Sequence, residues 1–324
     1  MRSEPPPGVA VGYVHPTASS VIVDEFLASR GGAQVDLTAS YELCRRINAA
    51  HGRTYYLATR LLPAAKRPHV HALYAFARYA DDLVDHLGLD WSALQRRHEL
   101  EAWTKNFLSD LDAGSTADPV CKAVIHTITS LGIDHADVQA FLRSMAMDLT
   151  VTRYDTYDDL YDYVHGSAAV IGTMMLPILQ PITPQARQPA MDLGVAFQLT
   201  NFIRDVGEDF ERSRVYLPQE DFRRFGVTDA DLATGQVSPN LRRLLQFEIA
   251  RTRALYRQAE AGWYMLPPAS ARSIRTAHHL YAGILDQVEA NDYEIFALRA
   301  ATPRRRKAAV IAREVLRRPA PNPA

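Results

Sequence analysis

The chain has 324 residues, of which 47% are hydrophobic and 23% charged, and its net charge at pH 7 is −1. This composition is typical of a globular protein with a sizeable core, and the near-zero net charge argues against nucleic acid as a partner. The two cysteines form no CxxC pair, which argues against a disulfide framework or zinc site and fits a reducing, cytoplasmic compartment.

The first 37 residues predict an irregular segment, because prolines and glycines recur there without a sustained period. No apolar core of a secretory signal follows the prolines at positions 5–7. The most apolar stretch, residues 172–179, is too short to span a bilayer and is broken by Pro177. We therefore expect no transmembrane helix, although such a chain can still rest on a membrane surface.

From Thr38 to about residue 300 the pattern is helical, and few stretches alternate with period two. Polar breaks separate helices rather than domains, and they fall at 111–118, 181–189, 225–240 and 265–270. The sequence therefore predicts an all-α protein with a single domain over 38–302 and a short basic tail over 303–324.

The first helix that can be placed well runs from Pro68 to His86, with proline in its first turn. Four polar residues at steps of four, three and four share one face: Tyr74, Arg78, Asp81 and Asp85. Asp82 follows Asp81 directly, and it lies four residues after Arg78, one position around the helix from the stripe. This helix therefore carries an acidic stripe beside an apolar one.

The second such helix runs from Pro189 to Arg212. Its polar stripe has steps of three, four and four and consists of Gln198, Asn201, Asp205 and Asp209. Glu208 and Arg212 flank the stripe. An acidic pair on a solvated face would be the ordinary explanation, but like charges four residues apart destabilise a helix. Two helices with the same unfavourable pair indicate a cation between them.

The ligand types indicate which cation this would be. Carboxylates and an amide carbonyl are hard oxygen donors, which Mg²⁺ or Mn²⁺ prefers. Mg²⁺ usually completes its shell with water and substrate phosphates, so the pattern also predicts a phosphorylated ligand. Arg78 and Arg204, beside the carboxylates, would neutralise the same phosphates.

The tail over 303–324 has seven basic residues and one acidic residue, a net charge of +6. Short apolar runs within it would form one face of a helix. One interpretation is a solvated, partly frayed terminus. The other is a peripheral contact with an anionic membrane surface, to which basic residues are attracted.

Several segments resemble the squalene/phytoene synthase family. HALYAFARYADDLVD and FQLTNFIRDVGEDFERSRVYLP are similar to its two acidic signatures. HGRTYYLATRLLPAAKR (51–67) and LYAGILDQVEANDYEIF (280–296) resemble its first core helix and its last conserved segment. The central helix departs from the family, because it reads GSAAVIG where members usually read close to AGTVG. The side chains stay small there, so close approach of a helix or substrate remains feasible.

The resemblance implies a single-domain isoprenoid synthase helical bundle with a central cavity. It also implies head-to-head joining of two prenyl diphosphates through a cyclopropyl diphosphate. The missing membrane anchor and nucleotide loop favour geranylgeranyl diphosphate as substrate, phytoene as product and no need for NADPH. The alternatives are a squalene or dehydrosqualene synthase using farnesyl diphosphate, a related enzyme of hopanoid synthesis, and a non-catalytic relative that acts as an assembly scaffold.

The resemblance also assigns roles to residues. Five residues would hold the magnesium ions: Asp81, Asp85, Asn201, Asp205 and Asp209. Seven would bind the substrates: His51, Arg53, Thr54, Arg78, Asp82, Gln198 and Arg212. Six would act in catalysis: Tyr74, Arg78, Tyr163, Arg204, Tyr216 and Tyr281.

Overall fold

A computed structural model of the protein describes residues 36–85 and 92–317, except for the side chains of Asp85 and Ala93. The expected irregular segment at the N-terminus lies almost wholly outside the described residues, as does the end of the basic tail. Within the described ranges the chain forms helices and one isolated bridge between Arg153 and Val215. The all-α prediction is confirmed.

The elements follow one another as α2 (Leu37–His51), α3 (Arg53–Thr59), α4 (Arg67–Asp85), α5 (Ala93–Ala113), α6 (Cys121–Leu131), α7 (His135–Met147), α8 (Tyr157–Val164), the π-helix η1 (His165–Ala169), α9 (Val170–Leu179), the 3₁₀ helix η2 (Pro184–Ala186), α10 (Arg187–Glu211), α11 (Gln219–Phe225), α12 (Asp229–Ala233), α13 (Pro239–Ala259), the 3₁₀ helix η3 (Glu260–Met265), α14 (Pro268–Ala290) and α15 (Arg304–Leu316). None of the helices in the described ranges is both long and apolar enough to cross a bilayer.

Local signals in the sequence explain where several helices begin and end. The Asp36 side chain accepts a hydrogen bond from the Ala39 amide at 2.7 Å and so caps the start of α2. Thr156 and Asp159 form a reciprocal capping box at the start of α8. Gly114 ends α5 with a φ of +66°, a conformation that glycine adopts without strain.

The two acidic helices form close to where the sequence predicts them. α4 begins one residue before the predicted start at Pro68, and α10 begins two residues before its predicted start at Pro189. Differences of one or two residues are usual at helix ends, which fray. Both helices therefore carry their polar stripes in the predicted register.

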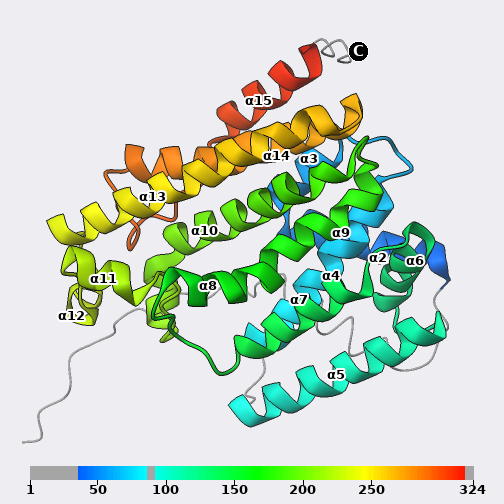
Figure 1. The fold of residues 1–324 in the computed structure, drawn as a ribbon, viewed down its shortest axis with the longest axis horizontal. Helices are drawn as coiled ribbons and strands as arrows, with labels where there is room; N and C mark the ends of the chain where they lie inside the picture. The colour runs from blue at the N-terminus through cyan, green and yellow to red at the C-terminus, as the bar shows by residue number, and fades with distance from the viewer. Residues whose placement is uncertain (1–35, 86–91, 318–324) are drawn as a thin grey trace, which may run out of the picture.

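Buried side chains form two clusters, one around α4 and one around α10. The first cluster draws on α2, α4, α5, α6, α7 and α9, and the second on α8, α10, α11, α13 and α14. In Figure 1, α13, α14 and α15 lie along one edge of the molecule and α5 along the opposite edge, with α4, α9 and α10 between them. The helices that carry the predicted site are thus central.

Glycine allows the central helix to approach α10 closely. A Cβ atom on Gly172 would lie 2.1 Å from the carbonyl oxygen of Ala190, and one on Gly194 would lie 2.3 Å from that of Ala168. Both distances are far shorter than any contact between Cβ and oxygen. The small residues of GSAAVIG therefore serve close backbone packing, and the π-helix η1 lies within this segment.

Candidate active site

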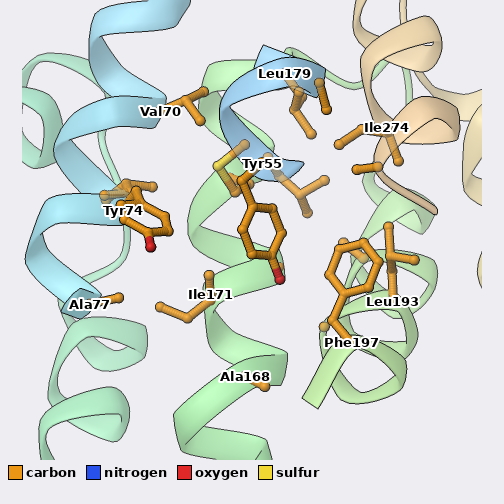
Figure 2. Close-up of a pocket in the computed structure, with 18 of the residues that line it drawn as sticks. Tyr55, Val70, Tyr74, Ala77, Ala168, Ile171, Leu179, Leu193, Phe197 and Ile274 are labelled. Carbon is orange, nitrogen blue, oxygen red and sulfur yellow. The ribbon is translucent and has the colours of Figure 1, made fainter. Parts of the chain in front are cut away.

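A cavity of about 360 Å³ lies between the two buried clusters, within the size range of small-molecule sites. It is lined by side chains from α2, α3, α4, α7, α8, the η1–α9 segment, η2, α10, α13, η3 and α14. Figure 2 shows Tyr55, Tyr74 and Phe197 around it, with Val70, Leu179 and Ile274 further along. Most of its wall is apolar, including Leu62, Leu73, Ile171, Met175, Leu176, Leu193 and Leu266.

One end of the cavity is polar, and there the structure brings predicted residues together. Six of them line the cavity: Tyr74, Arg78, Asp81, Tyr163, Gln198 and Asn201. They come from α4, α8 and α10, and 120 positions of the chain separate Asp81 from Asn201. The two polar stripes therefore face one common space, and we refer to this end as the mouth.

The acidic residues of α4 at the mouth are held by an arginine on the same helix. An Arg78 guanidinium nitrogen donates to Asp82, and another lies 3.6 Å from Asp81. The Asp82 side chain is nearly buried, whereas that of Asp81 is half-exposed. Asp85 ends α4, but its side chain lies outside the described part of the chain.

The acidic residues of α10 are likewise paired with arginines. Arg204 Nε donates to Asp205 at 2.6 Å, and Arg299 donates to the same carboxylate at 3.0 Å. Arg299 also lies 3.2 Å from Glu208. Further along, Asp209 is partly exposed near the end of α10, and Arg212 is exposed at its cap.

The segment around α3 supplies further polar groups. Burial, together with the charge of Arg78, lowers the pKa of His51 to about 4, so this imidazole is neutral at physiological pH. Thr54 accepts a hydrogen bond from Lys307 Nζ of α15 at 3.3 Å. Burial and the charge of the exposed Arg53 lower the pKa of Lys307. Lys307 and Arg53 therefore place two cationic groups at the start of α3, where they suit an anion.

Aromatic rings form a continuous cluster beside the mouth. The Tyr281 ring lies 4.5 Å from that of Phe197 and 4.7 Å from that of Tyr55. Tyr281 is buried behind these two rings, which themselves line the cavity. Burial raises the pKa of Tyr74 and Tyr281, so their hydroxyl groups stay protonated.

Tyr216 lies behind the cavity rather than on its wall. Its ring stacks on Phe202 at 4.2 Å and lies 5.9 Å from the ring of Tyr163, which does line the cavity. Its hydroxyl donates to the buried Asp148 at 2.9 Å. In this arrangement Tyr216 supports Tyr163 from behind, and its predicted catalytic role remains a prediction.

Three residues at the site were not predicted individually. Tyr55 and Phe197 line the cavity, and Arg299 contacts the α10 carboxylates. Tyr55 and Phe197 fall inside segments that already resemble the family, so that resemblance was the available signal. Arg299 lies in an irregular segment, and only the fold brings it beside Asp205.

The donor set suits a hard divalent ion. Carboxylates and an amide oxygen from two different helices border one space, because Asp81 and Asn201 both line the cavity. In residues 36–84 and 92–317, no three His, Cys, Asp or Glu side chains already gather closely enough to hold a metal ion. The structure instead pairs Asp81 and Asp205 with arginines, and the metal site stays a prediction.

Known proteins are similar to this chain over most of its length. The family model for squalene/phytoene synthases matches residues 48–307. A phytoene synthase of Arthrospira platensis is 37% identical over 277 residues, which cover 82% of this chain and 88% of the relative. A 15-cis-phytoene synthase of Synechococcus elongatus is 36% identical over 287 residues, covering 85% and 92%.

Solved structures share the fold. A dehydrosqualene synthase in complex with a ligand superposes with a TM-score of 0.78 at 28% identity, covering 86% of this chain and 96% of the other. A squalene synthase, HpnC, from Alicyclobacillus acidocaldarius gives a TM-score of 0.72 at 26% identity, covering 83% and 100%. The predicted isoprenoid synthase fold is confirmed.

Proposed function

The chain belongs to the squalene/phytoene synthase family, and from this premise we propose that it is a prenyltransferase that condenses two geranylgeranyl diphosphates head to head into phytoene. The observation that carries the proposal is a cavity with a charged mouth and an apolar interior. A prenyl diphosphate has the same two parts, an anionic head and a long hydrocarbon chain. The reaction would supply a precursor for carotenoids.

The longer extent of the cavity, along α10, is sufficient for a twenty-carbon chain. At a rise of about 1.5 Å per residue, its lining extends about 16 Å along α4 from Val70 to Asp81. It extends about 22 Å from Ala186 at the start of α10 to Asn201. An extended isoprene unit adds about 5 Å, so three units need about 15 Å and four about 20 Å.

The reaction begins when the carbon–oxygen bond of one substrate breaks and its electron pair leaves with diphosphate. The guanidinium groups of Arg78, at the mouth, and of Arg204, paired with Asp205, would neutralise the charge that develops on the leaving group. The double bond of the second substrate attacks the allylic cation, and loss of a proton closes the cyclopropane ring. Ionisation of this cyclopropyl diphosphate releases the second diphosphate, and the rearranged cation then loses a proton to give linear phytoene without a reductant.

The cavity wall protects the cationic carbon centres. The faces of Tyr55, Tyr74 and Phe197 could each stabilise a nearby cation by about 0.5–2 kcal/mol. The apolar walls exclude water, which would otherwise capture the cation as an alcohol. We assign Tyr163 and Tyr281 to the same aromatic lining, with Tyr216 supporting it.

We further propose that Mg²⁺, or Mn²⁺ in its place, assists this chemistry without NADPH. The ion would be held by Asp81, Asp85, Asn201, Asp205 and Asp209. When bound, it supplies Lewis acidity that makes diphosphate a better leaving group. His51, Arg53, Thr54, Asp82, Gln198 and Arg212 would bind the diphosphate groups and water around them.

The setting is proposed to be the cytoplasm, at a membrane surface that receives the insoluble product, with no nucleic acid as partner. Cys44 and Cys121 are both buried and free, which agrees with a reducing compartment. We assign residues 38–302 to the synthase domain, preceded by the irregular segment over 1–37 and followed by the basic tail over 303–324.

The test is incubation of the purified chain with geranylgeranyl or farnesyl diphosphate, each with and without Mg²⁺ and NADPH, followed by identification of the products. Phytoene from geranylgeranyl diphosphate and Mg²⁺ alone is the expected result. Reaction of farnesyl diphosphate only, or a product that changes with NADPH, would establish a squalene-type activity instead. No reaction with either substrate would favour a scaffold role.

A further inference from the structure

Four of the six large apolar side chains that stand exposed on the described residues gather at one end of the molecule. Ile182, 62% exposed, follows α9, and Tyr264, 64% exposed, lies in η3. Val315 and Leu316, 50% and 81% exposed, end α15. Exposed side chains of this size are notable when they cluster rather than when they are scattered.

Contacts join these segments into one surface. The Ile182 amide donates to the Met265 carbonyl at 2.9 Å. The ring of Trp263, also in η3, lies 5.7 Å from that of His279, and His279 Nε2 lies 3.0 Å from Arg313 of α15. Figure 1 agrees, because the start of α10, the start of α14 and the end of α15 all lie toward the upper right.

The same end is the inner, closed end of the cavity. Leu179, Trp263 and Leu266 line the cavity, and Ile182 and Tyr264 lie within three residues of them in the chain. The mouth lies at the opposite end, toward the C-termini of α4 and α10. The chain segments that line the apolar end of the cavity therefore also carry Ile182 and Tyr264 of the exposed cluster.

The charge of α15 adds a second feature. Its single carboxylate, Glu314, is fully buried and accepts from Arg275 Nε at 2.7 Å. The side chains of Arg313 and Arg317 remain 63% and 43% exposed. Because the acidic group points inward, the outer side of this helix presents cationic and apolar groups together, a combination that suits an anionic lipid surface.

We propose that this end, which we term the docking end and define by Ile182, Tyr264, Val315, Leu316, Arg313 and Arg317, rests on a lipid bilayer with anionic headgroups. The inference extends the proposed function, since a forty-carbon hydrocarbon would then leave through the closed end directly into lipid. The mouth would face water, where diphosphate is released. Docking needs no spanning helix, because the apolar side chains enter only the interfacial region.

The test uses the full chain and sedimentation with vesicles of equal parts phosphatidylglycerol and phosphatidylcholine, or of phosphatidylcholine alone. Ile182→Asp combined with Leu316→Asp should lower the partition coefficient for anionic vesicles by about tenfold or more. Arg317→Gln should lower it up to about fivefold, and added salt should weaken binding of the unaltered chain. Leu94→Asp is the matched control, because Leu94 is 76% exposed on α5, away from the docking end.

Turnover in detergent micelles separates this inference from the proposed function, because no bilayer is needed there. The docking variants should keep their turnover in micelles while losing vesicle binding. Equal vesicle binding by the docking variants and by Leu94→Asp would overturn the docking end, whatever the turnover. Equal binding of the unaltered chain to both vesicle types would overturn the anionic-lipid assignment.

Discussion

Ala186→Phe, at the closed end of the cavity, should change the preferred substrate from twenty to fifteen carbons. Ala186 lies in η2, is buried and lines the cavity. A phenyl ring reaches about 5 Å beyond Cβ, which matches one extended isoprene unit. The remaining cavity would hold about three units of prenyl chain instead of four.

The expected effect follows from the carbons that lose their burial. Five carbons at about 0.8 kcal/mol each amount to about 4 kcal/mol, or roughly a thousandfold in kcat/KM for geranylgeranyl diphosphate. Farnesyl diphosphate, whose chain ends short of η2, should lose less than about tenfold. Competition between the two substrates, followed by chromatography of the products, measures both values.

Two controls accompany this variant. Ala186→Val adds less volume and should have an intermediate effect on the substrate ratio. Thermal denaturation checks that the phenylalanine variant folds, since overpacking a buried site costs about 1–3 kcal/mol. A folded Ala186→Phe protein that keeps the original preference would refute the assignment of the cavity's closed end to the end of the prenyl chain.

Four further outcomes are expected. Asp81→Ala or Asp205→Ala should keep the helical circular dichroism but lower diphosphate release by at least about a hundredfold, and near-normal release would remove that carboxylate from the mechanism. Burial lowers the pKa of His71 from 6.5 to about 4. The folded state therefore has the full stabilisation from a neutral His71 above about pH 6.5, and it loses this stabilisation as the pH falls toward 4. Urea titrations should show this loss, up to about 3 kcal/mol, and a smaller one in His71→Gln. Gly194→Ala should lower the free energy of unfolding by about 1–3 kcal/mol, because its Cβ would clash with the η1 backbone. Glu314→Leu should destabilise the docked α15, as measured by urea unfolding and by proteolysis of the C-terminal segment.

The parts of the fold that could be predicted are the long helices whose apolar residues recur at helical spacing. α4 and α10 carry apolar residues at helical spacing and begin close to a proline, so their limits and the register of their stripes follow from the sequence. The predicted register puts Arg78 and Asp81 on one helix face and Gln198 and Asn201 on another, and these two faces line the cavity. Long helices with one buried face reveal which side chains share a direction.

The rest depends on contacts between distant segments. α3 has only seven residues, too few for a periodic signal to show that Tyr55 points into the cavity. Arg299 reaches Asp205 across 94 positions, from a segment without regular structure. The π-helix η1 packs closely against α10, a contact between segments that local periodicity does not reveal. The tail over 303–324 allowed two interpretations, and the structure shows a helix over most of its described part, packed against α14.

The expected effect of Glu314→Leu rests on the asymmetry of the charges around this residue. Glu314 is fully buried, and its carboxylate lies within 4.0 Å of cationic groups of Arg275, Arg313 and Arg317 and of the His279 ring. Removing the carboxylate takes away this partner of Arg275, whose side chain is only 14% exposed, and leaves it beside two other arginines. Breaking such a buried ion pair lowers the free energy of unfolding by about 3–5 kcal/mol. Arg275→Leu should cost less, because Arg313 and Arg317 still neutralise the carboxylate. The double variant should be more stable than Glu314→Leu alone, since no buried guanidinium remains unpaired. Equal stability of Glu314→Leu and the unaltered chain would show that apolar contacts, and not this carboxylate, hold α15 against α14.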